Sequence, residues 1–127
     1  MYLILSSAAV GFVGMLFVIL LSFWVLKQDP GTKEMQEISE AIREGAMAFL
    51  FREYRAIAIF VIIVGLLLGF AINKFTGIAF VIGAACSIAA GFIGMNIATR
   101  ANCRTAQAAK KDFNSAMSVA FPGGAVM

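Results

Sequence analysis

The chain has 127 residues, of which 61% are hydrophobic and only 13% are charged, and its mean hydropathy is +0.93. This balance excludes an ordinary soluble domain and indicates a membrane protein. The net charge is +3 and histidine is absent, which removes the common general base and the common nitrogen ligand for metals.

Three uncharged runs predict three transmembrane helices. They cover residues 2–26, 56–72 and 75–99, and a span of the hydrocarbon core needs roughly 20 residues. No Lys or Arg precedes the first run, and it is longer than a signal-peptide core of about 7 to 15 residues, so we expect a retained helix over about 2–26. The middle run is short, but three side chains at its edge can reach the headgroup zone: Arg52, Tyr54 and Arg55.

The basic residues give the predicted orientation. Nine of the ten lie in two segments, which are Lys27, Lys33, Arg43, Arg52 and Arg55 in the first, and Arg100, Arg104, Lys110 and Lys111 in the second. Because basic residues in short loops remain in the cytoplasm, we expect residues 27–55 and 100–115 there and the N-terminus outside. Only Lys74 lies on the other side, in an expected tight outer turn over residues 73–77.

The segment after KQDPGT predicts a long helix over about 33–72. Thr32 can cap it, and Glu34 lies in its first turn. Its first half is amphipathic, with an apolar stripe of Met35, Ile38, Ile42, Gly45, Ala46 and Phe49 and an opposite face of Lys33, Glu37, Glu40, Arg43 and Glu44. We therefore expect a long cytoplasmic extension whose apolar stripe needs a partner.

The third helix is expected over about 75–111 and the start of a fourth over about 115–127. Small residues predict close helix packing at Gly65 and Gly69, and along a stripe of Gly83, Ser87, Ala90 and Gly94. Asn96 and Asn102 are expected to bond neighbouring helices, and Cys86 and Cys103 are expected to be packing residues. The predicted fold class is all-α integral membrane, with residues 1–127 forming the N-terminal part of a single multi-helix domain.

Two clusters are candidate ligand sites. Glu37, Glu40 and Glu44 could hold magnesium, but one exposed helix face lacks octahedral geometry, so a solvated face is favoured. Arg100, Arg104 and Lys111 could contact phosphate, but the tendency of basic residues to stay on the cytoplasmic side of a membrane already explains their position. No Asp, Glu, Lys or Arg lies within the three uncharged runs, so these helices by themselves offer no ion path. We therefore assign no catalytic, cofactor-binding or metal-binding residue to this span.

Three segments, in chain order, carry a resemblance to a known family: GTKEMQEISEAIREGAMAFLFREYRAI, GFIGMNIATRANCRTAQAA and AFPGGAVM. They resemble the N-terminal region of the membrane-bound, ion-translocating inorganic pyrophosphatases, over roughly residues 30–127. The most specific points are EGAMAFLFREY, ATRANCRTAQAA and the glycine pair of FPGGAVM. Cys103 departs mildly from the small aliphatic residue expected at its position.

The resemblance implies a parent enzyme that hydrolyses magnesium-bound pyrophosphate and exports protons or sodium ions. It implies a homodimer that uses Mg²⁺, and it leaves dependence on K⁺ open. This span would supply outer-ring scaffold, with the catalytic residues later in the parent chain and the remaining helices and the lipid bilayer as its partners. We expect a prokaryotic inner membrane as the location and no nucleic acid as a partner.

Two alternatives stay open at this stage. The first is a complete small membrane scaffold or interaction protein that docks a partner through the amphipathic helix of residues 33–55. The second is a small multidrug-type transporter, which is disfavoured because it needs a carboxylate within the membrane. The apolar run that begins in MSVAFPGGAVM favours the opening part of a longer protein over both.

Overall fold

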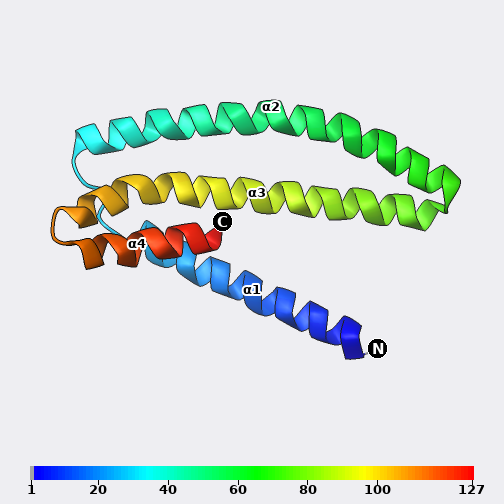
Figure 1. Cartoon of the computed structure of the whole chain (residues 1–127), viewed down its shortest axis with the longest axis horizontal. Coiled ribbons are helices and arrows are strands. Elements are labelled where there is room, and N and C mark those ends of the chain that lie inside the picture. Colours follow the sequence, from blue (N-terminus) through cyan, green and yellow to red (C-terminus); the bar gives the residue numbers. More distant parts are fainter. Residues whose placement is uncertain (1) are drawn as a thin grey trace.

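The computed structural model describes residues 2–127, with the side chains of residues 5–7 and 9–127. These residues form four helices, α1 (Tyr2–Leu26), α2 (Lys33–Ala71), α3 (Lys74–Ala109) and α4 (Phe113–Val126), and no strand (Figure 1). The first three are long and apolar enough to cross a membrane. The prediction of an all-α integral membrane fold, with a long extension on the second helix, is confirmed.

The two longest helices, α2 and α3, lie side by side as an antiparallel hairpin (Figure 1). We call the residues that join them, Ile72 and Asn73, the hairpin tip. At the opposite end, α4 folds back along α3, and the C-terminal end of α1 contacts both α3 and α4. We call this region, residues 26–33 and 104–112, the charged end. From the charged end, α1 runs away from the hairpin toward the N-terminus (Figure 1).

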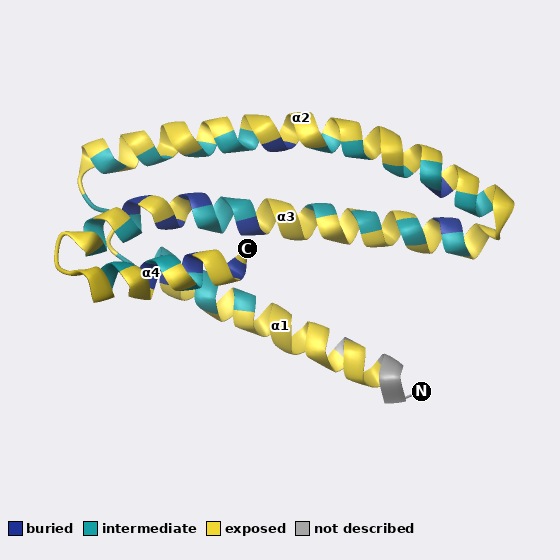
Figure 2. Ribbon diagram, in the orientation of Figure 1, coloured by how far each residue is buried: buried dark blue, intermediate teal, exposed yellow. Residues whose placement is uncertain are grey.

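The buried core is small and is concentrated toward the charged end (Figure 2). Its apolar residues are Val25, Leu50, Ala101, Cys103, Val119 and Val126. Large apolar side chains elsewhere are exposed, including Phe70 and Phe75 beside the hairpin tip. In a bilayer such side chains contact lipid, so the hairpin has little need of an apolar interior.

Side-chain caps determine where three of the helices begin. Thr32 Oγ1 accepts a hydrogen bond from the Met35 amide at 3.4 Å, as the sequence predicts. Asn73 Oδ1 accepts from the Thr76 amide at 2.8 Å, which lets the hairpin turn within the two tip residues. Asp112 Oδ1 accepts from the Ser115 amide at 2.7 Å, so α4 begins at Phe113 instead of the expected residue 115.

Close packing of the hairpin depends on glycines on both helices. A Cβ atom added to Gly77 would lie 2.8 Å from the carbonyl oxygen of Gly65 and 3.0 Å from the Cα of Gly69. The predicted Gly65 and Gly69 motif therefore packs against Gly77. Along the other predicted stripe, only Gly94 is buried in the described chain, whereas Gly83, Ser87 and Ala90 are exposed. Gly94 packs against Met127.

The extension of α2 turns a different face toward α3 from the one that the apolar stripe predicted. Ile38, Ile42 and Phe49 are exposed by 64%, 48% and 60%. Two hydrogen bonds to α3 set this rotation, because Ser39 Oγ donates to the carbonyl of Thr99 at 3.3 Å and the Tyr54 hydroxyl donates to the carbonyl of Ile88 at 3.0 Å. Ile38, Ile42 and Phe49 therefore face away from α3, whereas Met35 and Ala46 of the same stripe are half-buried.

The glycine contact gives a direct stability prediction. Gly77→Ala should force the two backbones of the hairpin apart and lower stability by about 1–3 kcal/mol, the usual cost of overpacking. The matched control is Gly83→Ala on the same helix, where an added Cβ meets no atom within 4 Å. Thermal unfolding in detergent, followed by helical circular dichroism, should show a lower midpoint only for Gly77→Ala. Equal midpoints for both variants would contradict the glycine-dependent packing.

Candidate functional site

The charged end contains a joint in which Arg104 of α3 holds the last turn of α1. Its Nη2 donates to the carbonyl of Leu26 at 3.3 Å, and its Nη1 donates to the carbonyl of Arg100 at 2.7 Å. The C-terminal carbonyls of a helix lack partners within the helix and carry a partial negative charge, so a guanidinium is a suitable cap. Arg104 therefore caps α1 from a different helix.

A second contact of the joint connects the turn after α1 to α3. Asp29 Oδ2 accepts a hydrogen bond from Gln107 Nε2 at 3.1 Å, and Asp29 Oδ1 accepts from the Gly31 amide at 2.9 Å. Gly31 has a φ of 81°, which favours glycine, and an added Cβ would lie 3.2 Å from Gln107 Cβ. The backbone hydrogen bond from Gly31, then the bond from Gln107, lower the pKa of Asp29 below its usual value, with Lys111 nearby.

A polar cavity of about 180 Å³ lies at this joint, between the ends of α1, α3 and α4. Its charged lining consists of Arg104, Lys111 and Asp29. Arg104 Nε and Gln107 Oε1 are buried and have no hydrogen-bond partner among the described residues. Of the predicted phosphate contacts, the structure brings Arg104 and Lys111 to the cavity and leaves Arg100 outside it. Both Nη groups of Arg104 already bond carbonyls, so Arg104 is arranged to hold α1 against α3 and not to bind a phosphate.

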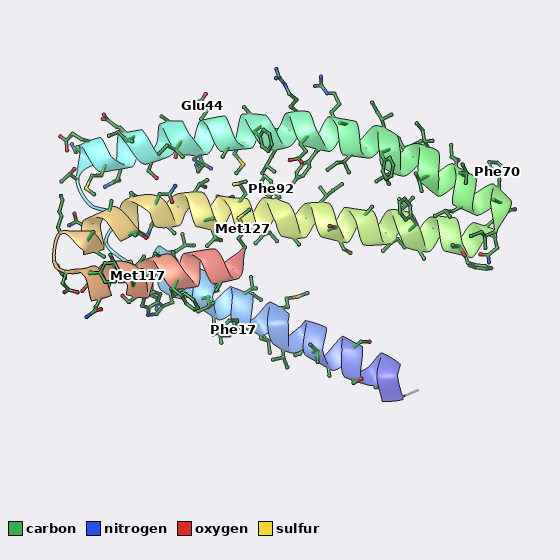
Figure 3. All side chains as sticks on the ribbon, viewed as in Figure 1. Phe17, Glu44, Phe70, Phe92, Met117 and Met127 are labelled. Atoms are coloured by element: carbon green, nitrogen blue, oxygen red, sulfur yellow. The ribbon has the colours of Figure 1, made fainter. Side chains whose placement is uncertain are left out.

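The acidic face of α2 contains one ion pair. Glu40 accepts hydrogen bonds from Nε and Nη2 of Arg43, and these bonds lower the pKa of Glu40. Glu44 lies on the side of α2 away from α3 (Figure 3). No three His, Cys, Asp or Glu side chains within the described part of the chain are grouped to hold a metal ion. Glu37, Glu40 and Glu44 are thus arranged as an exposed face with one internal ion pair.

Of the asparagines and cysteines noted in the sequence, some are buried and others are exposed. Asn96 Oδ1 is buried and has no partner in the described chain, while Asn102 is exposed. Cys103 is buried, as expected for a packing residue, and Cys86 is exposed. The contacts of Asp29, Ser39 and Tyr54 were not anticipated. The Asp-Pro-Gly sequence could have indicated that Asp29 bonds the backbone within a turn. The bonds of Ser39 and Tyr54 depend on the register of α2 against α3, which the sequence does not reveal.

These helices and the polar joint at one end define a polytopic α-helical membrane protein. The family model described as inorganic H⁺ pyrophosphatase matches residues 12–127. The chain therefore belongs to the inorganic H⁺ pyrophosphatase family, in agreement with the resemblance carried by its three motifs.

Named relatives support the same assignment. The chain is 48% identical over 117 residues to the K⁺-insensitive pyrophosphate-energized proton pump 2 of Moorella thermoacetica, covering 91% of this chain and 17% of the relative. It is 44% identical over 126 residues to the K⁺-insensitive pyrophosphate-energized proton pump of Methanosarcina mazei, covering 98% and 19%. It is 45% identical over 105 residues to the K⁺-stimulated pyrophosphate-energized sodium pump of Thermotoga maritima, covering 81% and 14%. The chain thus spans less than a fifth of the length of these relatives.

Arg104 has two possible roles, which are to hold α1 through its hydrogen bonds and to set the membrane orientation through its positive charge. A substitution that keeps the charge distinguishes them. Arg104→Lys keeps the positive charge but cannot supply the planar pair of donors, so the last turn of α1 should lose protection from hydrogen exchange. We expect roughly tenfold faster exchange in residues 24–28, the effect of losing one hydrogen bond. Arg100→Lys is the matched control, because Arg100 is exposed. Equal exchange in both variants would show that Arg104 does not hold α1.

The Asp29 contact predicts a response only at acid pH. Because the folded pKa lies below the ordinary value of 3.8, the contact stabilises the fold above that pH and is lost as pH falls through the lowered pKa. The amide resonance of Gly31, followed by NMR in detergent, should titrate with a midpoint below 3.8. Asp29→Asn should abolish this step. A midpoint above the ordinary value would contradict the proposed hydrogen bonds.

Proposed function

We propose that this chain is the N-terminal part of a pump that couples hydrolysis of inorganic pyrophosphate to the export of protons or sodium ions. The observation that carries the proposal is the family match over residues 12–127, with 44–48% identity to named proton pumps over at least 91% of the chain. All four described helices lie within or overlap the matched residues. The parent protein would be the enzyme, an ion-translocating inorganic diphosphatase.

Within that pump, the span would act as scaffold. Its three uncharged runs contain no Asp, Glu, Lys or Arg, the residue types that usually carry an ion across a membrane. Its polar joint uses Arg104, Gln107 and Asp29 to hold α1 against α3. The residues that bind pyrophosphate, activate water and gate the ion are therefore proposed to lie outside this span, and this span alone is expected to be inactive.

The proposed cofactor and partners belong to the parent protein. Magnesium pyrophosphate would be its substrate. Among the described residues no three carboxylates are grouped to hold a metal ion, and Glu40 is paired with Arg43. Relatives include both K⁺-stimulated and K⁺-insensitive pumps, so a requirement for potassium varies within the family. We propose a homodimeric parent in which the remaining helices pack against this span.

The proposed location is a prokaryotic inner membrane, with the N-terminus outside and residues 27–55 and 100–115 in the cytoplasm. The basic residues support this orientation, because nine of ten fall in those two segments. The named relatives come from bacteria and archaea, which agrees with the location.

A second candidate is a membrane scaffold or interaction protein that docks a partner through residues 33–55. The observation in its favour is the unpartnered stripe of Ile38, Ile42 and Phe49 on the extension of α2. The same stripe is expected if later helices of a pump cover it.

A chimera distinguishes the two candidates. The matching N-terminal part of the Methanosarcina mazei proton pump is replaced by this chain, and pyrophosphate hydrolysis and proton uptake are measured in membrane vesicles. The pump proposal predicts that both are retained, because the scaffold would pack against the remaining helices. This chain alone should hydrolyse no pyrophosphate above the background of empty vesicles.

A scrambled order of residues 33–55 within the chimera is the control, and it should abolish both signals. A correctly inserted chimera without hydrolysis would contradict the pump proposal, and hydrolysis by the chain alone would contradict the scaffold role.

A further inference from the structure

An apolar groove of about 580 Å³ runs along the hairpin between α2 and α3, close to its tip. Its lining is Ile62, Gly65, Leu66, Gly69 and Phe70 from α2, and Lys74, Gly77, Ile78, Val81 and Ile82 from α3. The wall residues Ile62, Leu66, Ile78 and Ile82 are each about 60% exposed. The groove therefore lies open along the outside of the hairpin, and Figure 3 shows Phe70 beside its tip.

Glycines give the groove its depth. Gly65 and Gly77 bring the two backbones together, whereas a Cβ added to Gly69 would meet no atom within 4 Å. Gly69 therefore borders open space even though it lies beside the close contact with Gly77. A side chain at this position would extend into the groove.

The length of the groove matches one leaflet of a bilayer. It extends from residue 62 to residue 70 on α2 and from residue 74 to residue 82 on α3. Eight steps at about 1.5 Å give about 12 Å. Half of a hydrocarbon core of about 30 Å is about 15 Å. A lipid chain of that leaflet, running from the surface toward the midplane, would lie parallel to the groove.

The tip end of the groove carries a single basic residue, Lys74. The sequence has no Asp or Glu between residues 54 and 111, so neither spanning segment of the hairpin offers a carboxylate to this lysine. A lysine at the end of a spanning helix reaches the headgroup zone, where the phosphates of anionic lipids carry negative charge. The charge at one end and the apolar lining along the rest match the two parts of an anionic phospholipid.

We propose that the groove binds an anionic glycerophospholipid, with an acyl chain along Gly69 and its phosphate beside Lys74. A transmembrane helix is a poorer occupant. The glycines that would let another helix approach closely already serve the contact between α2 and α3.

The test is lipid retention by the chain, measured by native mass spectrometry after extraction from nanodiscs of equal phosphatidylglycerol and phosphatidylcholine. The unmodified chain should retain phosphatidylglycerol preferentially. Lys74→Gln should reduce this preference about fivefold, the effect expected of one lysine near an anionic lipid surface. Gly69→Leu should fill the groove and remove the retained lipid, while Gly83→Leu, where an added Cβ also meets no atom, should not.

A second measurement does not depend on the folding of a variant. Phosphatidylglycerol with a photoreactive acyl chain is crosslinked to the unmodified chain in nanodiscs, and the labelled residues are mapped by mass spectrometry. Labelling concentrated on residues 62–70 and 74–82 supports the proposal. Labelling spread evenly over α1, α2 and α3, equal loss of lipid in both leucine variants, or a dimer mass in place of bound lipid would overturn it.

Discussion

Backbone hydrogen bonding in the hydrocarbon core is the constraint on which this structure depends. Without water, each peptide group in the core must find its partner within the protein, so long uncharged runs form helices. The same constraint concentrates polar side-chain bonds where the chain leaves the core or where a helix ends. Three side-chain bonds accordingly cap helix beginnings at Thr32, Asn73 and Asp112, and two more hold the end of α1 and its following turn to α3. The folded shape follows from a few polar ties and from close backbone contact at glycines.

The two ends of the hairpin are stabilised in different ways. Toward the tip, Gly65, Gly69 and Gly77 allow the backbones to approach, which increases dispersion contacts without any apolar core. At the charged end, Arg104 and Gln107 hold α1 through a carbonyl and a carboxylate. This arrangement leaves the apolar surface of the helices exposed, and that surface is available to lipid and to further helices.

Local patterns predicted much of the fold because their causes are local. The cap at Thr32 and the glycine motif on α2 depend on residues close in sequence, and both were anticipated. The inner face of the α2 extension was not, since the hydrophobic pattern indicated Ile38 and Ile42 while Ser39 and Tyr54 set the rotation through bonds to α3. In a membrane protein, hydrophobicity marks contact with lipid as well as burial, so apolar periodicity alone does not reveal which face is inside.

By itself, the sequence determined the membrane class, the positions of the helices and the family, because uncharged run length, capping residues and motif order are properties of the linear chain. Only the tertiary structure decided which groups meet across distant segments. It placed Arg104 on the carbonyl of Leu26, Gln107 on Asp29 and Gly77 against Gly65. The physical reason is that these contacts depend on the register and rotation of packed helices, and each is a short-range interaction that a shift of one residue would abolish.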